Sequence, residues 1–238
     1  LLESVEGGAV RGRYSMIGVE PDVIWRAFGD RAEINRQPAT GPDAFAPMPG
    51  GTLQALRALL EESRVALPAD LPPMAAGVFG YMGYDTVRLV ERLPADKPDP
   101  LGIPDAILIR PTVLVIFDAV RDEMTIVTPV YADKRVSAIS AYEAAAARLA
   151  TAVEALEGPL PHVSAPLASP PSPPRPVSNT SPAAYMGMVR KAKEHIAAGD
   201  IFQAVLSQRF ASPFTLPPFS LYRALRRTNS SPFLYHLD

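Results

Sequence analysis

The 238-residue sequence contains no cysteine, so disulfide bridges and thiolate metal sites are excluded. Its three histidines, His162, His195 and His236, lack the spacing of metal ligands, which argues against a histidine-based zinc site. A formal net charge of -2 leaves no basic excess to attract phosphates, so nucleic acid is not an expected partner. No apolar run is long enough to cross a bilayer, and the first residues do not resemble a signal peptide. We therefore expect a cytoplasmic protein.

The composition, 47% hydrophobic and 20% charged, is that of an ordinary globular protein. The length suffices for one large domain or for one and a half. The chain does not begin with methionine, and both of its ends fall in stretches that read as strands. These features predict that the polypeptide is a fragment of a longer protein.

The N-terminal third predicts strands followed by a helix. Residues 1–36 contain partly alternating apolar stretches, and Gly29-Asp30 supplies the turn between two antiparallel strands. The Thr52 hydroxyl is expected to cap a helix that ends before Pro68. The apolar face predicted for this helix consists of Leu53, Leu56, Leu59 and Leu60.

The middle of the chain predicts further strands and a long helix. Residues 75–84 are apolar and punctuated by glycine, which favours a central strand closely approached by another backbone. A short helix over 85–93 and strands over 107–118 and 124–131 follow. A helix over 133–156 completes this part. Its inward-facing residues are expected to be Val136, Ile139, Leu149, Val153 and Leu156.

A proline-rich stretch over residues 158–177 is the clearest boundary and predicts an extended, exposed linker between 1–157 and 178–238. After it, Ser181 and Pro182 form a strong helix start, and Gly199 is a natural left-handed stop. The mixture of strands and helices lacks strict βαβ alternation. It indicates an α+β fold, with antiparallel sheets and flanking helices.

The last third predicts a strand over 201–210, a helix over 219–227 and a final strand over 231–238. Alternation places Gln203, Ser207 and Arg209 on one face of the first strand. On periodicity alone, this pattern favours a half-exposed strand over the wall of a polar cavity. Phosphate loops, dinucleotide fingerprints, nucleophile elbows and zinc helices are absent from the sequence, so no standard motif assigns a chemistry.

Five stretches in order resemble anthranilate synthase component I, a chorismate-utilising enzyme. They are LLESVEGG at 1–8, GRYSMIG at 12–18, FGYMGYDTVR at 79–88, AGDIFQAVLSQRF at 198–210 and NSSPFLY at 229–235. The fourth resembles the signature that enters the catalytic domain of this family. The resemblance spans nearly the whole chain apart from the loops and the linker, and the order of five motifs makes it specific.

The resemblance implies an enzyme that converts chorismate and ammonia to anthranilate and pyruvate in tryptophan synthesis. It further implies a glutamine amidotransferase partner subunit in a hetero-oligomer, a Mg²⁺ ion and feedback inhibition by tryptophan. The residues that hold Mg²⁺ and most catalytic residues of the family correspond to positions beyond Asp238. We therefore expect no metal site in this chain and no activity from it alone.

The resemblance also implies an inhibitor site. Its residues are Ser4, Pro232, Phe233 and Leu234, with Leu2, Glu3 and Asn229 as further candidates. The family often has Tyr-Met where this chain has Phe233-Leu234 and Pro where it has Ser230. Phe233 keeps the aromatic surface of the tyrosine but lacks its hydroxyl. Gln203 is assigned to the active-site wall, because glutamine cannot accept a proton at neutral pH as the lysine of water-adding relatives does.

Two alternatives remain open. Aminodeoxychorismate synthase, of the folate pathway, shares the fold and can retain a tryptophan site, although the stretch over 81–88 is more similar to anthranilate synthase. The other alternative is a non-catalytic module that binds an amino acid. The product formed by the full-length protein distinguishes the first alternative, and the reading frame beyond Asp238 distinguishes the second.

Overall fold

The computed structural model describes residues 1–238 except 5–11, 95–97, 132, 134, 161–174 and 230. Two compact units are present, one formed by Leu1–Pro159 with Tyr222–Asp238 and the other by Leu160–Leu221. The fold is α+β with antiparallel sheets, as the sequence predicts. Most of the predicted linker lies outside the described residues. Within those residues, no helix is long and apolar enough to span a membrane.

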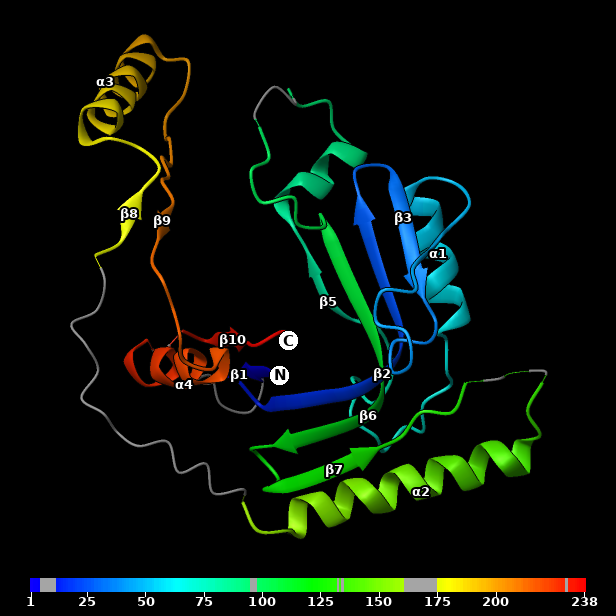
Figure 1. The fold of residues 1–238 in the computed structure, drawn as a ribbon. Coiled ribbons are helices and arrows are strands. Elements are labelled where there is room, and N and C mark those ends of the chain that lie inside the picture. Colours follow the sequence, from blue (N-terminus) through cyan, green and yellow to red (C-terminus); the bar gives the residue numbers. More distant parts are fainter. Residues whose placement is uncertain (5–11, 95–97, 132, 134, 161–174, 230) are drawn as a thin grey trace. The chain divides into compact units, whose positions relative to one another are not determined.

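The first unit is built on an eight-stranded antiparallel sheet (Figure 1). Its strands are β1 (Leu2–Ser4), β2 (Tyr14–Phe28), β3 (Arg31–Asn35), β4 (Ala46–Pro47), β5 (Phe79–Met82), β6 (Ala106–Asp118), β7 (Glu123–Val127) and β10 (Phe233–Tyr235). Its other elements are the helices α1 (Thr52–Glu62) and α2 (Ala138–Glu157), the 3₁₀ helix η1 (Tyr84–Leu89) and the end of α4 (Pro218–Thr228). The long strands β2 and β6 pair with each other and connect the remaining strands.

A bend divides the β2–β6 ladder into two halves with separate cores. The register shifts between Pro21 and Val23, and Glu20 has a positive φ of 52°. One core consists of Val23, Trp25, Ala27, Ala32, Ile34, Ala55, Leu59 and Ala106, and the other of Met16, Ala75, Leu114 and Ile116. Alternate residues of the second half of β2 enter the first core, as expected for a strand with period two. The second core lies at the half of the sheet where β1 pairs with β2, because Leu2 is paired with Met16 and packs against this core.

Helix α1 is capped differently from the prediction. Its N-cap is Gly51, without a side-chain cap, while the Thr52 N–H donates to Asp30 Oδ1 at 2.9 Å. The Thr52 hydroxyl donates to the Gly29 carbonyl at 2.8 Å, so the β2–β3 turn anchors the helix start. A distant carboxylate thus replaces the local cap. The predicted face is also partly wrong, because Leu59 is buried but Leu60 is 49% exposed.

The long helix α2 begins at Ala138, five residues later than predicted, with Ser137 as its N-cap. Its buried residue is Ala145, whereas Ile139 and Leu156 are exposed, so the predicted inward face is wrong. Small alanine side chains allow the helix to lie close to β7 (Figure 1).

Two further predictions need correction. The strand expected over 75–84 is reduced to β5, which pairs only with β6 among the described strands and is not central. The expected close backbone approach is present at Gly80, where a Cβ would lie 2.0 Å from the Ile107 carbonyl oxygen. The predicted helix over 85–93 is the shorter 3₁₀ helix η1.

The second unit contains α3 (Pro182–Ala198), β8 (Val177–Ser178) and β9 (Phe210–Ala211). Ser181 caps α3 by accepting from the Ala184 N–H at 3.2 Å, and Gly199 ends it at a φ of 82°, both as predicted. The strand predicted over 201–210 is wrong, because β9 covers only its last residue and the one that follows. A strand needs a partner, and the two residues of β8 supply one only at that end.

An ion pair joins the start of β2 to the end of β6. The Arg13 Nε lies 2.9 and 3.0 Å from the Asp118 carboxylate oxygens, and the N–H groups of Val120 and Arg121 also donate to this carboxylate. The hydrogen bond from Arg13 is the largest cause that lowers the pKa of Asp118 to about 2. This pair therefore fastens the edge of the second core.

We expect Asp118→Asn to cost stability at neutral pH and progressively less in acid. The folded pKa of about 2 lies below the unfolded value of about 3.9, so the contribution is complete above pH ~4 and is lost as pH falls towards 2. Urea unfolding of both proteins at pH 7 and pH 3 measures the difference. A deficit that does not shrink at pH 3 would contradict this account.

Candidate functional site

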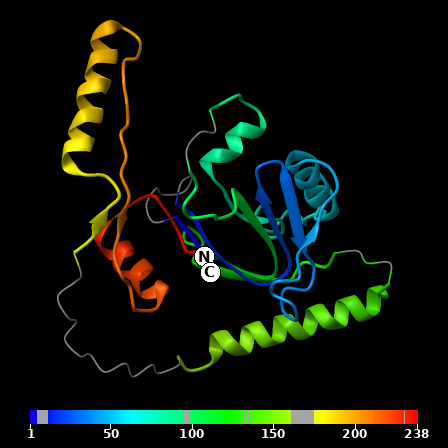
Figure 2. The same ribbon diagram turned by 45° about the horizontal axis from the view of Figure 1, so that its top comes forward.

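The two ends of the chain meet in an antiparallel ladder. Strand β1 pairs with β10 in the register Leu2 with Tyr235, Glu3 with Leu234 and Ser4 with Phe233. Leu1 and His236 extend this ladder by exchanging two backbone hydrogen bonds of 2.8 Å. Figures 1 and 2 both show the termini side by side. The structure therefore brings together the sequence-predicted residues of both ends, and we call β1 and β10 the terminal ladder.

The terminal ladder places the predicted residues on two faces. Because Leu1 and His236 form a hydrogen-bonded pair, the next such pair is Glu3 with Leu234, and Ser4 with Phe233 is a non-hydrogen-bonded pair. Directly opposed residues share a face, and neighbours along a strand alternate. Ser4 and Phe233 thus lie on one face, whereas Glu3 and Leu234 lie on the other.

The face that carries Ser4 is open at the edge of the sheet. Phe233 is 69% exposed, Pro232 is exposed and Ser4 is half-buried. Leu2, on the same face, packs against the second core. Asn229, another predicted residue, ends α4 by donating its N–H to the Leu225 carbonyl at 2.8 Å. An aromatic ring and a hydroxyl are therefore available side by side to a ligand.

The opposite face is occupied by α4. The Arg226 Nε lies 3.1 and 3.0 Å from the two carboxylate oxygens of Glu3, and the Tyr222 hydroxyl donates to the same carboxylate. Tyr222 is buried, and its ring centroid lies 5.7 Å from that of His236. Burial, followed by the hydrogen bond to Glu3, raises the pKa of Tyr222. The Glu3 carboxylate is thus already engaged by protein groups.

Sequence reasoning did not identify Tyr222 and Arg226. Their spacing of four residues on the helix predicted over 219–227 places them on one face, which is the only local signal they carry. Their partner Glu3 lies more than 200 residues away, and only the pairing of the two termini reveals it.

Gln203, the candidate for the active-site wall, is in the second unit. It is exposed and lies in the extended segment before β9, outside any strand. Most of its neighbours are exposed as well, including Phe202 and Val205. The described residues therefore do not build a cavity around Gln203.

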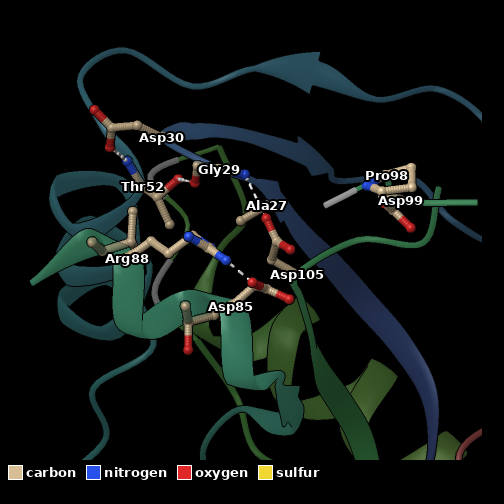
Figure 3. Close-up of a pocket in the computed structure, with 11 residues that line it drawn as sticks. Ala27, Gly29, Asp30, Thr52, Asp85, Arg88, Pro98, Asp99 and Asp105 are labelled. Atoms are coloured by element: carbon tan, nitrogen blue, oxygen red, sulfur yellow. Dashed lines mark hydrogen bonds and ion pairs between the residues drawn. The ribbon is translucent and has the colours of Figure 1, made fainter. Parts of the chain in front are cut away.

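A cavity of about 440 Å³ lies between the β2–β3 turn and η1 (Figure 3). Several of its acidic side chains already have structural partners. Asp30 and Asp105 accept from the backbone N–H groups of Thr52 and Gly29, at 2.9 and 2.6 Å. Asp85 is paired with Arg88 at 2.8 Å. These contacts stabilise turns and helix ends and do not indicate a ligand.

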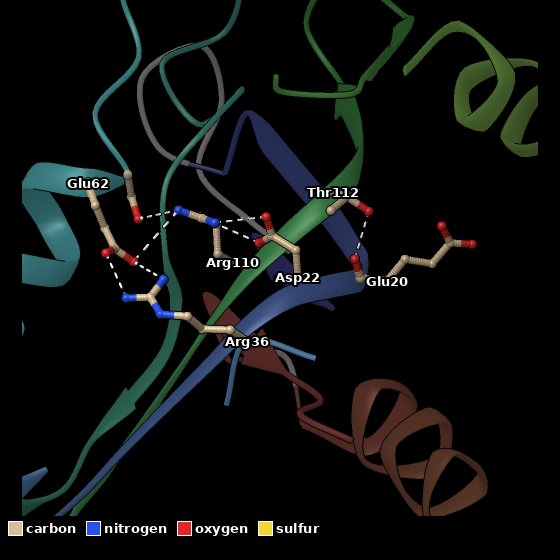
Figure 4. Close-up of polar contacts among 7 residues, drawn as sticks. Glu20, Asp22, Arg36, Glu62, Arg110 and Thr112 are labelled. Atoms are coloured by element: carbon tan, nitrogen blue, oxygen red, sulfur yellow. Dashed lines mark hydrogen bonds and ion pairs between the residues drawn. The ribbon is translucent and has the colours of Figure 1, made fainter. Parts of the chain in front are cut away.

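A larger cavity of about 590 Å³ adjoins an ion network around the buried Arg110 at the bend of β2 (Figure 4). Arg110 donates to both carboxylate oxygens of Asp22, each at 2.8 Å, and its guanidinium lies 4.1 Å from the centre of the Tyr131 ring. Glu62 accepts two hydrogen bonds from Arg36. The charges of this network neutralise one another, so it fastens β2 to β6 and to the end of α1.

Among the residues that the structure describes, no three histidine, cysteine, aspartate or glutamate side chains are grouped so that they could hold a metal ion. The donor set for the magnesium ion implied by the resemblance is not found among these described residues.

Comparison with known proteins agrees with the resemblance. Anthranilate synthase component 1 of Cereibacter sphaeroides is 49% identical over 238 residues, and that of Thermus thermophilus is 40% identical over 247. Each alignment covers 100% of this chain and 47% of the relative. The crystal structure of anthranilate synthase component I from Streptococcus pneumoniae matches with a TM-score of 0.74 and 26% identity, covering 97% of this chain and 49% of that one.

This chain spans about half the length of the curated relatives it matches. The model of the chorismate binding enzyme family matches residues 18–238, which include most of β2 and all of β3 to β10. The match thus takes in both compact units and the β10 side of the terminal ladder. This chain belongs to the family of chorismate binding enzymes.

Proposed function

We propose that this chain is the N-terminal part of the large subunit of anthranilate synthase, which converts chorismate and ammonia to anthranilate and pyruvate. The similarity of the whole chain to anthranilate synthase component 1 from several bacteria carries the proposal. The enzyme is then a carbon–oxygen lyase of tryptophan biosynthesis that works in the cytoplasm. A glutamine amidotransferase subunit supplies the ammonia in a hetero-oligomer.

Product analysis of the full-length protein tests this reaction. With chorismate, Mg²⁺ and an ammonium salt, we expect the ortho isomer, anthranilate, together with pyruvate. Formation of the para precursor without anthranilate would instead assign the protein to aminodeoxychorismate synthesis. Binding of an amino acid without turnover would favour the non-catalytic module.

The 238-residue polypeptide alone is expected to form no anthranilate. Gln203 is exposed, and the segment around it is not paired into a sheet, so the proposed active-site wall is incomplete here. The relatives are about twice as long, and we assign the remaining catalytic residues to the other half. Ammonia-dependent anthranilate formation by this polypeptide, above a no-enzyme blank, would refute this expectation.

We further propose that the terminal ladder binds tryptophan as a feedback inhibitor. An amino-acid ligand needs polar partners for its ammonium and carboxylate and an apolar surface for its indole ring. Phe233 and Pro232 offer that surface, and the Ser4 hydroxyl lies on the same face as Phe233. Because Arg226 and Tyr222 already engage Glu3, backbone carbonyls are the better partners for the ammonium. Inhibition then requires tighter binding to the less active state.

Ser4→Phe in the full-length enzyme is expected to raise the tryptophan concentration for half-inhibition by at least about tenfold, because the added ring fills the space beside Phe233. Initial rates of anthranilate formation across a tryptophan series measure the shift. Glu123→Phe, which adds a ring at the exposed start of β7, is the control and should leave inhibition unchanged. Normal inhibition of Ser4→Phe would remove Ser4 from the site.

A further inference from the structure

Strand β1 has little backbone support of its own. It contains three residues, and its pairing with β2 is confined to Leu2 and Met16. The other side pairs with β10, itself a three-residue strand at the edge of the sheet. So short a ladder holds few hydrogen bonds, and segments of this kind are among the first to open locally. Side-chain contacts must therefore contribute much of what holds β1 in place.

The Glu3 carboxylate makes such a contact with α4. Only 15% of its side chain is exposed, so an unpaired charge there would lose hydration without compensation. Arg226 supplies a cation to both carboxylate oxygens, and the buried Tyr222 hydroxyl supplies a further hydrogen bond. Removing either partner leaves the carboxylate undersatisfied, and the least costly relief is movement of β1 towards water.

These contacts join β1, β10 and α4 in a closed circuit on the side of the terminal ladder opposite the ligand face, the face that carries Ser4 and Phe233. Helix α4 ends at Thr228, and the chain reaches β10 at Phe233, which pairs back to Ser4 on β1. Glu3 then joins β1 to α4 again. Since Glu3 points to the face opposite Ser4, the link leaves the ligand face free while it fixes the strand that carries Ser4.

We propose that Tyr222 and Arg226 are positioning residues that hold Ser4 in place through Glu3, and that this link connects tryptophan binding on the terminal ladder to helix α4. The proposal rests on the proposed tryptophan site. It adds a regulatory route, because α4 is the segment through which the chain returns from residues 160–221 to the first unit. A ligand that bridges Ser4 and Phe233 stabilises the same strand that Glu3 ties to α4.

The test uses the full-length protein and direct calorimetric titration with L-tryptophan. Arg226→Gln is expected to weaken tryptophan binding by about tenfold, and Arg226→Lys should restore part of it, because lysine keeps the charge but not the planar fork. Tyr222→Phe removes one oxygen, keeps the ring beside His236 and should weaken binding by about threefold. Arg227→Gln, the exposed neighbouring arginine, is the matched control and should bind as the wild type does.

Amide hydrogen exchange without ligand provides the second measurement. In Arg226→Gln and Tyr222→Phe, the amides of β1 and β10 should exchange faster than in the wild type and in Arg227→Gln. Wild-type affinity in both variants, with unchanged exchange, would overturn the positioning role while leaving the tryptophan site intact. No tryptophan binding by the wild type would overturn the proposed site and, with it, the regulatory link. If Arg226→Gln does not fold, Tyr222→Phe decides the matter alone.

Discussion

Gly80→Ala is expected to destabilise the first unit by more than about 4 kcal/mol, among the largest effects that a single methyl group can have. Gly80 has a φ of 156°, which L-residues rarely adopt. An added Cβ would lie 2.0 Å from the Ile107 carbonyl oxygen and 3.0 Å from the Leu108 Cα. Both are backbone atoms of the paired strand β6 and cannot rotate away, so β5 would have to separate from it.

Urea unfolding followed by circular dichroism measures this loss of stability. Gly102→Ala separates the cost of the positive φ from the cost of the clash with β6. Gly102 also has a positive φ, of 58°, but nothing lies within 4 Å of its added Cβ. Its substitution should therefore cost only the conformational term of about 1–2 kcal/mol. Equal losses in the two variants would show that the contact with β6 does not matter.

Elements specified by local chemistry could be predicted from the sequence. Ser181 with Pro182 marks the start of α3 and Gly199 its end, because both caps depend on atoms within one turn of the helix. The turn at Gly29 between β2 and β3 was predictable for the same reason, since its φ of 54° suits glycine.

Elements that depend on distant partners were predicted less well. Thr52 is a residue type that commonly caps helices, but the fold brings Asp30 to the start of α1, and its carboxylate accepts from the Thr52 N–H in place of a local cap. Helix α2 buries Ala145 while Ile139 and Leu156 are exposed, so hydrophobic periodicity alone predicted the wrong face. Residues 201–210 have the composition of a strand but obtain a partner only at their end.

The candidate site shows the same division. The resemblance places Ser4 and Phe233 in one site although they lie at opposite ends of the sequence, and the pairing of β1 with β10 makes them direct neighbours. The register was not predictable, and it is the register that places Ser4 opposite Phe233 and Glu3 opposite Leu234. The link from Glu3 to Arg226 depends on that register as well.

The ion pair between Asp22 and Arg110 at the bend of β2 leads to the second large prediction (Figure 4). Replacing Asp22 is expected to cost more stability than replacing Arg110. Only 9% of the Arg110 side chain is exposed, compared with 37% for Asp22. Asp22→Asn leaves a buried guanidinium whose remaining charged neighbour, Glu62, lies 3.9 Å away. Arg110→Met instead leaves a carboxylate that water can reach, and the methionine can pack against the Tyr131 ring.

We therefore expect Asp22→Asn to destabilise the first unit by about 3 kcal/mol and Arg110→Met by only about 1 kcal/mol. The double variant should be about as stable as Arg110→Met alone, because the amide no longer faces an unpaired buried cation. Urea unfolding of the wild type and the three variants at one pH and salt concentration completes the cycle. Additive losses, or a larger loss for Arg110→Met, would mean that the desolvated guanidinium is not what makes the pair necessary. The observed order of the two single variants thus decides whether Asp22 is present chiefly to neutralise Arg110 at the bend, where β2 passes from one core to the other.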